Sequence, residues 1–152
     1  MVTINRVTRE LIGAAIEVHR ELGPGLLESA YQACLVYEVA QRGLAIETQK
    51  ALPVIYRGIR VDAGYRVDML VEGVVLVELK SVGKLERIHE AQVLSYLRLS
   101  GLTVGLLINF NVERLRDGIR RLVNRYTGPR LDQPHSALSA PSAVKPPSDL
   151  DK

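Results

Sequence analysis

The sequence predicts an α/β fold in which helices flank a mixed central sheet of about four strands. Two kinds of pattern lead to this prediction. Apolar residues recur at the spacing of one helix face in residues 6–22, 26–42, 85–100 and 112–126. Between these segments lie short apolar or alternating runs that are bounded by glycine, which is typical of strands.

Glycine and proline mark where the predicted helices end. Gly23-Pro24-Gly25 ends the first helix, and Gly43 ends the second. The last predicted helix carries arginines on one side, which fits either a phosphate-binding stripe or a solvated helix face. In this helix Arg114, Arg121 and Arg125 would lie opposite Leu115, Ile119, Leu122 and Tyr126.

Three consecutive strands and one later strand make up the predicted sheet. The first, about residues 46–56, contains Pro53, and a proline within a strand indicates a sheet edge. A turn leads into the second strand, about residues 59–71, which is followed by VVLVELK, residues 74–80. The fourth strand is the buried run TVGLLINF, residues 103–110.

The 152 residues are enough for one domain with a substantial core. We expect this domain to span residues 1–126. Residues 127–152 hold five of the seven prolines and several serines, so we expect a disordered Pro/Ser-rich tail there. The net charge of +3 permits a nucleic-acid partner without indicating one.

The sequence shows no sign of secretion or of a membrane partner. The run LIGAAIEVHR, residues 11–20, is interrupted by charged residues and does not fit a signal peptide. No apolar run approaches the roughly 18 residues that span a bilayer. The single cysteine, Cys34, excludes an internal disulfide and fits a reducing compartment. We therefore expect a cytoplasmic protein.

The apolar strand VVLVELK ends with two charged residues on one face, Glu78 and Lys80. Taken alone, they would form an exposed ion pair that contributes about 0–1 kcal/mol. The preceding strand carries another acid, Asp68, at a position where both faces look covered. Arg66 lies on the same face as Asp68, so a structural ion pair between the two is one interpretation.

Polar residues also interrupt the apolar faces of three predicted helices. Glu28 lies in the first turn of the second helix, where the helix dipole alone would stabilise it by about 0.3–1 kcal/mol. His19 lies on the apolar face of the first helix and fits either a hydrogen-bonded core residue or a ligand. Gln92 and Tyr96 lie one turn apart on the third helix, where a buried Gln–Tyr hydrogen bond is the simplest interpretation.

Together these residues indicate a metal site. Asp68 and Glu78 come from neighbouring strands, and Glu28 comes from a helix that must cover the sheet. Carboxylates with few competing cations form a hard oxygen site suited to Mg²⁺ or Mn²⁺. Lys80 beside such a site would orient and help deprotonate a water, and the ion would stabilise a phosphodiester under in-line attack.

The shared site constrains the turn between the two strands. If Glu72-Gly73 were a two-residue loop, Asp68 would share a face with Val77 rather than with Glu78. A joint site therefore requires a three-residue loop or a bulge, most simply with Gly73 in the left-handed conformation. A regular two-residue turn would contradict the metal-site interpretation.

The same residues fit known nuclease motifs. The spacing Asp68-x9-Glu78-x-Lys80 resembles the PD-(D/E)xK nuclease motif, and the order of elements matches the core of that superfamily. Gln92 and Tyr96 are similar to the QxxxY motif of the RecB-type exonuclease branch. These motifs occur in the order that the superfamily requires.

GLLESAY, residues 25–31, resembles the motif that names the GxxExxY family. The flanking blocks VHRELGPG, YRVDMLV, VELK, AQVLSYL and GLLINF look like blocks of the same family. The resemblance extends from about residue 4 to residue 126. The proline that usually precedes the motif aspartate is absent, since Val67 occupies that place.

The resemblance implies a restriction-endonuclease-like fold with Asp68 and Glu78 as metal ligands. The backbone carbonyl of Leu79 would complete the metal shell, and His19 would be an additional ligand if this chain follows some RecB-type nucleases. Lys80 would be the catalytic lysine.

The remaining site residues have supporting roles in this resemblance. Glu28 would be the helix-borne acid, and Gln92 and Tyr96 would position the substrate. We add Arg66 to the substrate-positioning residues. Lys84 and Arg87 follow the motif strand and are well placed to meet a substrate backbone.

The sequence therefore predicts a nuclease that depends on Mg²⁺ or Mn²⁺, with DNA favoured over RNA as its substrate. We expect it to act as a homo-oligomer or with a partner protein, because it carries no separate substrate-binding domain. The alternative is a catalytically silent nucleic-acid-binding or scaffold module with the same fold. A third interpretation is a structural acid–base cluster that binds no ligand.

Overall fold

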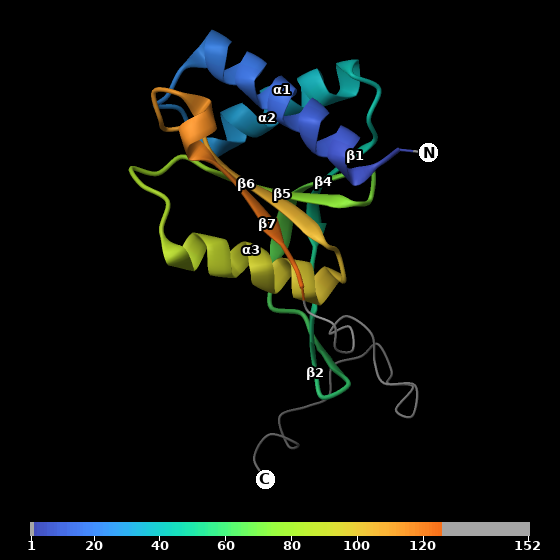
Figure 1. Ribbon diagram of the computed structural model, residues 1–152. Helices are drawn as coiled ribbons and strands as arrows, with labels where there is room; N and C mark the ends of the chain where they lie inside the picture. The colour runs from blue at the N-terminus through green and yellow to red at the C-terminus, as the bar shows by residue number, and fades with distance from the viewer. Residues whose placement is uncertain (1, 126–152) are drawn as a thin grey trace.

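Helices cover both faces of a five-stranded sheet in the computed structural model of this chain, which describes residues 2–125 (Figure 1). Two helices, α1 (Ile4–Leu22) and α2 (Glu28–Gln41), lie on one face. The third, α3 (Arg87–Ser100), lies on the other. The predicted α/β fold is confirmed, and each of these helices begins two residues away from its predicted start.

The strand order of the sheet is β1-β4-β5-β6-β7. Within it β5 and β6 run parallel, and α3 makes the long crossover that a parallel pair requires. The other neighbours are antiparallel, so the sheet is mixed, as predicted. The strands are β1 (Ile46–Ala51), β4 (Arg66–Val71), β5 (Val75–Lys80), β6 (Val104–Asn109) and β7 (Ile119–Val123).

The long strands predicted at residues 46–56 and 59–71 are each interrupted. Their inner parts are β1 and β4, and their outer parts form a separate two-stranded ribbon of β2 (Val54–Tyr56) and β3 (Ile59–Val61). Pro53 lies in the first interruption, where its missing N–H removes no bond from the main sheet. As predicted, the first strand lies at a sheet edge.

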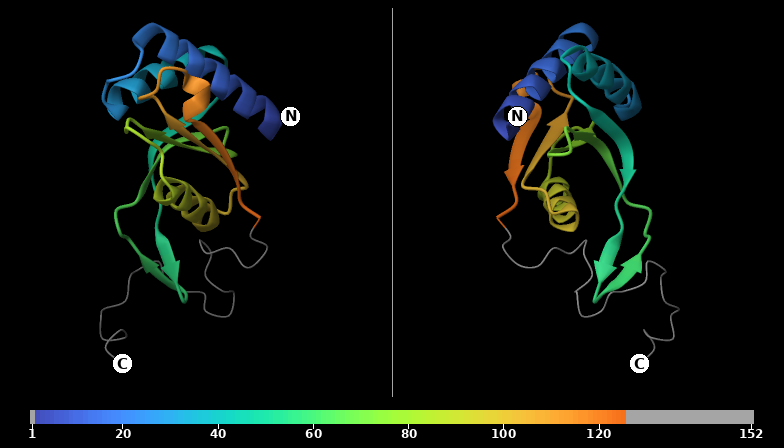
Figure 2. Two further views of the ribbon diagram at one scale, coloured as in Figure 1. Left: turned by 60° about the vertical axis from the view of Figure 1, so that its left-hand side comes forward. Right: turned by 90° about the vertical axis from the view of Figure 1, so that its right-hand side faces the viewer.

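We call residues 52–65 the arm, because they project from the body of the molecule (Figure 2). Ala51 pairs with Arg66 at the end of the main sheet, so the arm leaves and re-enters at one point. At its base the Leu52 N–H donates to the Tyr65 carbonyl at 2.9 Å. The arm thus extends from the ends of β1 and β4, but its two strands form a separate sheet.

The prediction of a helix at residues 112–126 is wrong. Leu115–Gly118 forms a short 3₁₀ turn, and the following residues form β7, antiparallel to β6. A Cβ at Gly118 would overlap the Asn109 carbonyl oxygen, so this close approach of the turn to the end of β6 requires glycine. The apolar spacing that suggested a helix combines one residue of the turn with residues of a strand.

The three arginines predicted to line one side of that helix lie on different segments of the structure. Arg121 lies on β7 and donates to Thr8 at 3.2 Å and Asn5 at 3.0 Å, so it binds the sheet to α1. Arg114 precedes the 3₁₀ turn, and Arg125 follows β7. Tyr126 lies outside the described residues.

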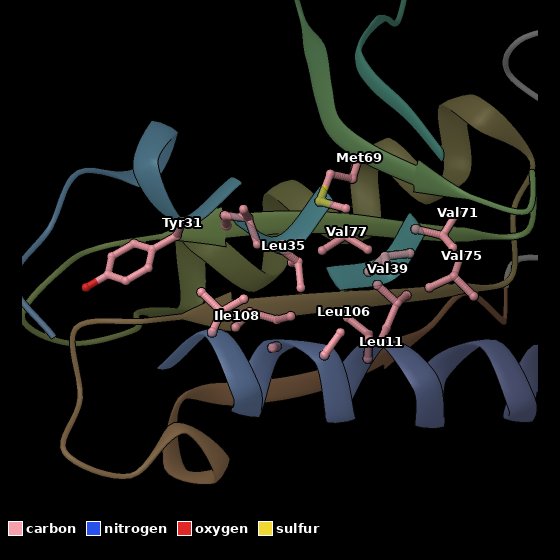
Figure 3. Packing of buried hydrophobic residues seen from close by; sticks show 14 of the residues in the cluster. Leu11, Tyr31, Leu35, Val39, Met69, Val71, Val75, Val77, Leu106 and Ile108 are labelled. Atoms are coloured by element: carbon pink, nitrogen blue, oxygen red, sulfur yellow. The ribbon is translucent and has the colours of Figure 1, made fainter. Parts of the chain in front are cut away.

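Apolar side chains on the two faces of the sheet form two separate cores. Val75, Val77 and Leu79 of β5 pack toward α1 and α2, and Leu76 packs toward α3. This alternation is the one predicted from period-2 spacing. Figure 3 shows the first core, to which α2 contributes Tyr31, Leu35 and Val39 and the strands contribute Met69, Val71, Leu106 and Ile108.

Two further predictions concern the ends of the chain and its surroundings. The disordered tail was placed at residues 127–152, which lie outside the described residues. Among residues 2–125, no helix combines the length and the apolar character that crossing a membrane requires.

Candidate active site

A three-residue loop, 72–74, joins β4 to β5 and sets the register between them. Val71 pairs with Val75 and Met69 pairs with Val77, so one further step places Asp68 opposite Glu78. Gly73 has φ 65°, in the left-handed region. The predicted three-residue loop and its left-handed glycine are therefore confirmed.

Glu72 is also left-handed, with φ 53°, which is uncommon for a residue with a side chain. Two bonds to Ala45 hold it there. The Glu72 N–H donates to the Ala45 carbonyl at 2.8 Å, and the Ala45 N–H donates to the Glu72 carboxylate at 2.5 Å. The loop is thus fixed by a segment that precedes β1.

The carboxylates of Asp68 and Glu78 each bind the other strand's backbone. The Asp68 N–H donates to Glu78 Oε1 at 3.1 Å, and the Leu79 N–H donates to Asp68 Oδ2 at 2.8 Å. The regular pairing of β4 with β5 ends one step earlier, at Met69 and Val77. Both acids are therefore held between the strands, where the prediction placed a shared site.

The pKa of Glu78 shows how strongly the surroundings disfavour its charged form. Its surroundings raise this pKa from 4.5 to about 8, most strongly through burial and next through the charge of Asp68. The ammonium of Lys80 opposes the rise, and the carboxylate of Glu28 adds to it. Glu78 is only 5 % exposed, so its negative charge is poorly compensated unless a cation joins the pair.

A chain of hydrogen bonds leads from Lys80 onto α3. Lys80 Nζ donates to Gln92 Oε1 at 3.2 Å, and Gln92 Nε2 donates to the Tyr96 hydroxyl oxygen at 3.0 Å. Burial raises the pKa of Tyr96. The predicted Gln–Tyr hydrogen bond is present, and it extends to the lysine. Glu78 and Lys80 are therefore not the exposed ion pair that the strand alone suggests.

Glu28 is the first residue of α2, and its side chain is exposed. The loop before it is fixed by Tyr31, whose hydroxyl donates to the Gly23 carbonyl at 2.6 Å and accepts from the Leu26 N–H at 3.1 Å. The Ser81 hydroxyl also donates to the Leu26 carbonyl at 2.6 Å, which connects this loop to the end of β5. These contacts bring Glu28 within electrostatic range of Glu78.

Gln49 is a site residue that the sequence did not reveal. It lies in β1 between the pairs of Thr48 with Met69 and Lys50 with Val67, which places it opposite Asp68. Its Nε2 donates to Asp68 Oδ1 at 3.1 Å and to Gln32 Oε1 of α2 at 2.8 Å. Gln49 has φ 49°, so a left-handed residue interrupts the strand beside the acid.

Two candidate residues have other partners. His19 Nε2 lies 2.7 Å from the Val112 carbonyl oxygen, and this histidine is 8 % exposed, as expected for a hydrogen-bonded core residue. Arg66 is exposed and donates to the Gln49 carbonyl at 3.3 Å. Within residues 2–125, Arg66 and Asp68 do not form the ion pair that was one interpretation of their spacing.

The carboxylate pair fits a hard divalent cation, although it does not surround one. Among residues 2–125, no group of three or more His, Cys, Asp and Glu side chains lies together as a metal site. Mg²⁺ is commonly bound through one or two carboxylates and keeps several waters. A buried carboxylate with a raised pKa beside a second acid has the oxygen donors and the uncompensated charge that such an ion requires.

Comparison with known proteins identifies the family. Residues 5–122 match the model of the PD-(D/E)XK nuclease superfamily, a range that includes Asp68, Glu78 and Lys80. No match was found among curated proteins or among solved structures. The helices and the mixed five-stranded sheet are consistent with a restriction-endonuclease-like fold. The chain therefore belongs to the PD-(D/E)XK nuclease superfamily.

Proposed function

We propose that this protein is a metal-dependent nuclease that hydrolyses phosphodiester bonds, with DNA rather than RNA as its substrate. The observation that carries the proposal is the pair of half-buried Asp68 and buried Glu78 with Lys80 beside it. Within the superfamily, we assign the chain to the GxxExxY family and the RecB-like branch. Gly25, Glu28 and Tyr31 support this assignment, together with the bonded Gln92–Tyr96 pair.

Each side chain has a task that follows from its contacts. Asp68 and Glu78 would hold the ion, and the Leu79 carbonyl would be a further oxygen donor, as the motif implies. When bound, Mg²⁺ or Mn²⁺ supplies positive charge that stabilises the phosphodiester under attack. Lys80 orients the attacking water, and Gln92 fixes the lysine by accepting its hydrogen bond. Glu28 adjusts the charge of the site from the start of α2.

A panel of labelled substrates tests this function. Single- and double-stranded DNA and RNA are incubated with Mg²⁺, Mn²⁺ or EDTA, with the wild type and Asp68→Asn in parallel. We expect the wild type to cut DNA with either ion, and we expect EDTA or Asp68→Asn to abolish cutting. Asp117→Asn, which changes an acid of the 3₁₀ turn, is the matched control and should cut normally.

One observation favours the alternative of a catalytically silent nucleic-acid-binding or scaffold module. Both carboxylate oxygens of Asp68 accept hydrogen bonds within the protein, from Leu79 N–H and Gln49 Nε2. Binding without cleavage of any substrate in either ion would support this alternative. Equal cutting by the wild type and Asp68→Asn would contradict the proposed site.

A further inference from the structure

The arm, residues 52–65, rises directly beside the candidate active site. Arg66 begins β4 at the foot of the arm, and Asp68 follows two residues later. Figure 2 shows that the ribbon of β2 and β3 extends beyond the level of α3. A strand of nucleic acid whose phosphate lay at Asp68 and Lys80 would therefore meet the arm on one side and α3 on the other.

A groove of about 450 Å³ lies between the arm and α3. The arm contributes Val54 and Tyr65 to it, and α3 contributes Ile88 and His89 among others. Gln92 and Tyr96 also line the groove, and Gln92 binds Lys80. The groove is thus continuous with the candidate active site through a side chain that both share.

The apolar part of the lining suits a flat aromatic ligand. Tyr65 is 46 % exposed, and its ring centroid lies 6.0 Å from that of Tyr96 at an angle of 55°. Ile88 is 67 % exposed, although it is a large aliphatic residue in the first turn of α3. A ring that entered between Tyr65 and Ile88 would cover apolar surface that is otherwise exposed to water.

The polar part of the lining suits the edge of a heterocycle. His89 Nδ1 accepts a hydrogen bond from the Glu86 N–H at 2.9 Å, so the neutral ring carries its proton on Nε2. Ser95 adds a hydroxyl to the same wall. Lys84 in the loop before α3, Arg87 at the start of α3 and Arg57 at the tip of the arm are exposed, so these cations can meet phosphates.

We propose that this groove binds one unpaired base of the substrate strand, next to the phosphate that the active site holds. The inference rests on the proposed nuclease function and narrows its substrate to DNA that is single-stranded or opened at the cleavage point. A base within a duplex presents its faces to its stacked neighbours, so it cannot also contact Tyr65 and Ile88.

Binding measured in EDTA tests the groove without any cutting. The fluorescence anisotropy of a labelled single-stranded oligodeoxynucleotide and of the matching blunt duplex is followed with the full-length wild type and three variants. Tyr65→Ala removes the ring, and Tyr65→Phe keeps it. Tyr37→Ala removes a tyrosine that is even more exposed, at 63 %, from α2 instead. Thermal melting of each variant shows that it is folded.

We expect the single strand to bind the wild type more tightly than the duplex does. Tyr65→Ala should weaken single-strand binding roughly 5- to 100-fold, the effect of losing one base–aromatic stack. Tyr65→Phe and Tyr37→Ala should stay within about twofold of the wild type, because neither removes a stacking ring from the groove.

The outcomes separate this inference from the nuclease function. Unchanged binding by folded Tyr65→Ala, or tighter binding of the blunt duplex, would contradict base binding in the groove, even if the protein cuts DNA. Loss of binding in Tyr65→Ala without cleavage by the wild type would support the groove and refute the nuclease function. If the wild type binds neither oligonucleotide, base binding in the groove is contradicted as well.

Discussion

Asp68 and Glu78 are held by each other's strand, and this arrangement brings two negative charges into a place with little water. The backbone N–H groups of Asp68 and Leu79 accommodate one carboxylate oxygen each. They do not neutralise a full charge, as the raised pKa of Glu78 indicates. At the scale of single residues, the poorly compensated charge of Asp68 and Glu78 therefore lowers the stability of the metal-free protein.

The first prediction concerns pH and the metal-free protein. Glu78 has a folded pKa of about 8, above its ordinary value of 4.5, so between these values the folded state binds more protons than the unfolded state. We expect the free energy of unfolding in EDTA to fall as pH rises through this window, by at most about 1.4 kcal/mol per pH unit. Asp68 and Glu28 strengthen this trend, and Lys80 weakens it.

Urea denaturation at several pH values between 5 and 8, in EDTA, measures this trend. Glu78→Gln cannot ionise at this position, so its stability should vary less with pH than that of the wild type. Mg²⁺ at the upper end of the window should stabilise the wild type and have little effect on Glu78→Gln. A wild-type stability that follows the pH profile of Glu78→Gln would contradict the buried charge.

The second prediction concerns Gln49, whose amide holds Asp68 from a left-handed position. Gln49→Gly removes the amide but suits the backbone, since glycine adopts this conformation without strain. We expect metal-free stability to change little and Mn²⁺ affinity, measured by calorimetry, to fall roughly 10- to 100-fold. Unchanged Mn²⁺ affinity would mean that Gln49 does not position the carboxylate.

At the scale of elements, the start of α2 depends on one tyrosine. The Tyr31 ring stacks on Phe110 with centroids 4.4 Å apart, and its hydroxyl holds both Gly23 and Leu26. The loop between α1 and α2 has no helical bonds of its own, so these contacts define the position of Glu28. The tyrosine of the GLLESAY motif thus fixes the loop from which the glutamate of the same motif extends.

The third prediction follows from this anchor. Tyr31→Phe keeps the stacked ring but leaves the Gly23 carbonyl and the Leu26 N–H without their partner. We expect a loss of about 1–3 kcal/mol in the free energy of unfolding, measured by chemical denaturation. Tyr37→Phe on the exposed side of the same helix should change stability by less than about 0.5 kcal/mol. Equal stability of the two variants would contradict the anchoring role.

The elements that the sequence predicted correctly are those whose apolar residues follow a single spacing, either helical or alternating. VVLVELK and the first three helices have apolar faces, most of whose residues pack against the sheet as expected. Residues 112–126 were misjudged because Leu115, Ile119 and Leu122 have helical spacing by coincidence, and the contact of Gly118 with Asn109 depends on the folded chain. The arm was missed because its strands resemble continuations of β1 and β4.

At the scale of the whole molecule, the candidate site is assembled from both layers of helices. Glu28 and Gln32 reach it from α2, and Gln92 reaches it from α3 on the opposite face. Period-2 alternation was sufficient to predict that Asp68 and Glu78 meet only across a three-residue loop or a bulge, and the structure has the loop. It could not predict Gln49, because a left-handed glutamine within a strand has no signature in the sequence.

Metal-dependent cleavage of DNA by Lys80→Met tests the central claim most directly, because methionine keeps most of the side-chain volume and removes the ammonium. The rate is compared with that of the wild type and of Lys50→Met, which changes an exposed lysine of β1 that pairs with Glu47. We expect Lys80→Met to lose roughly 100-fold or more in rate and Lys50→Met to keep its rate. Cleavage by folded Lys80→Met at the wild-type rate would contradict an active site built on Asp68, Glu78 and Lys80.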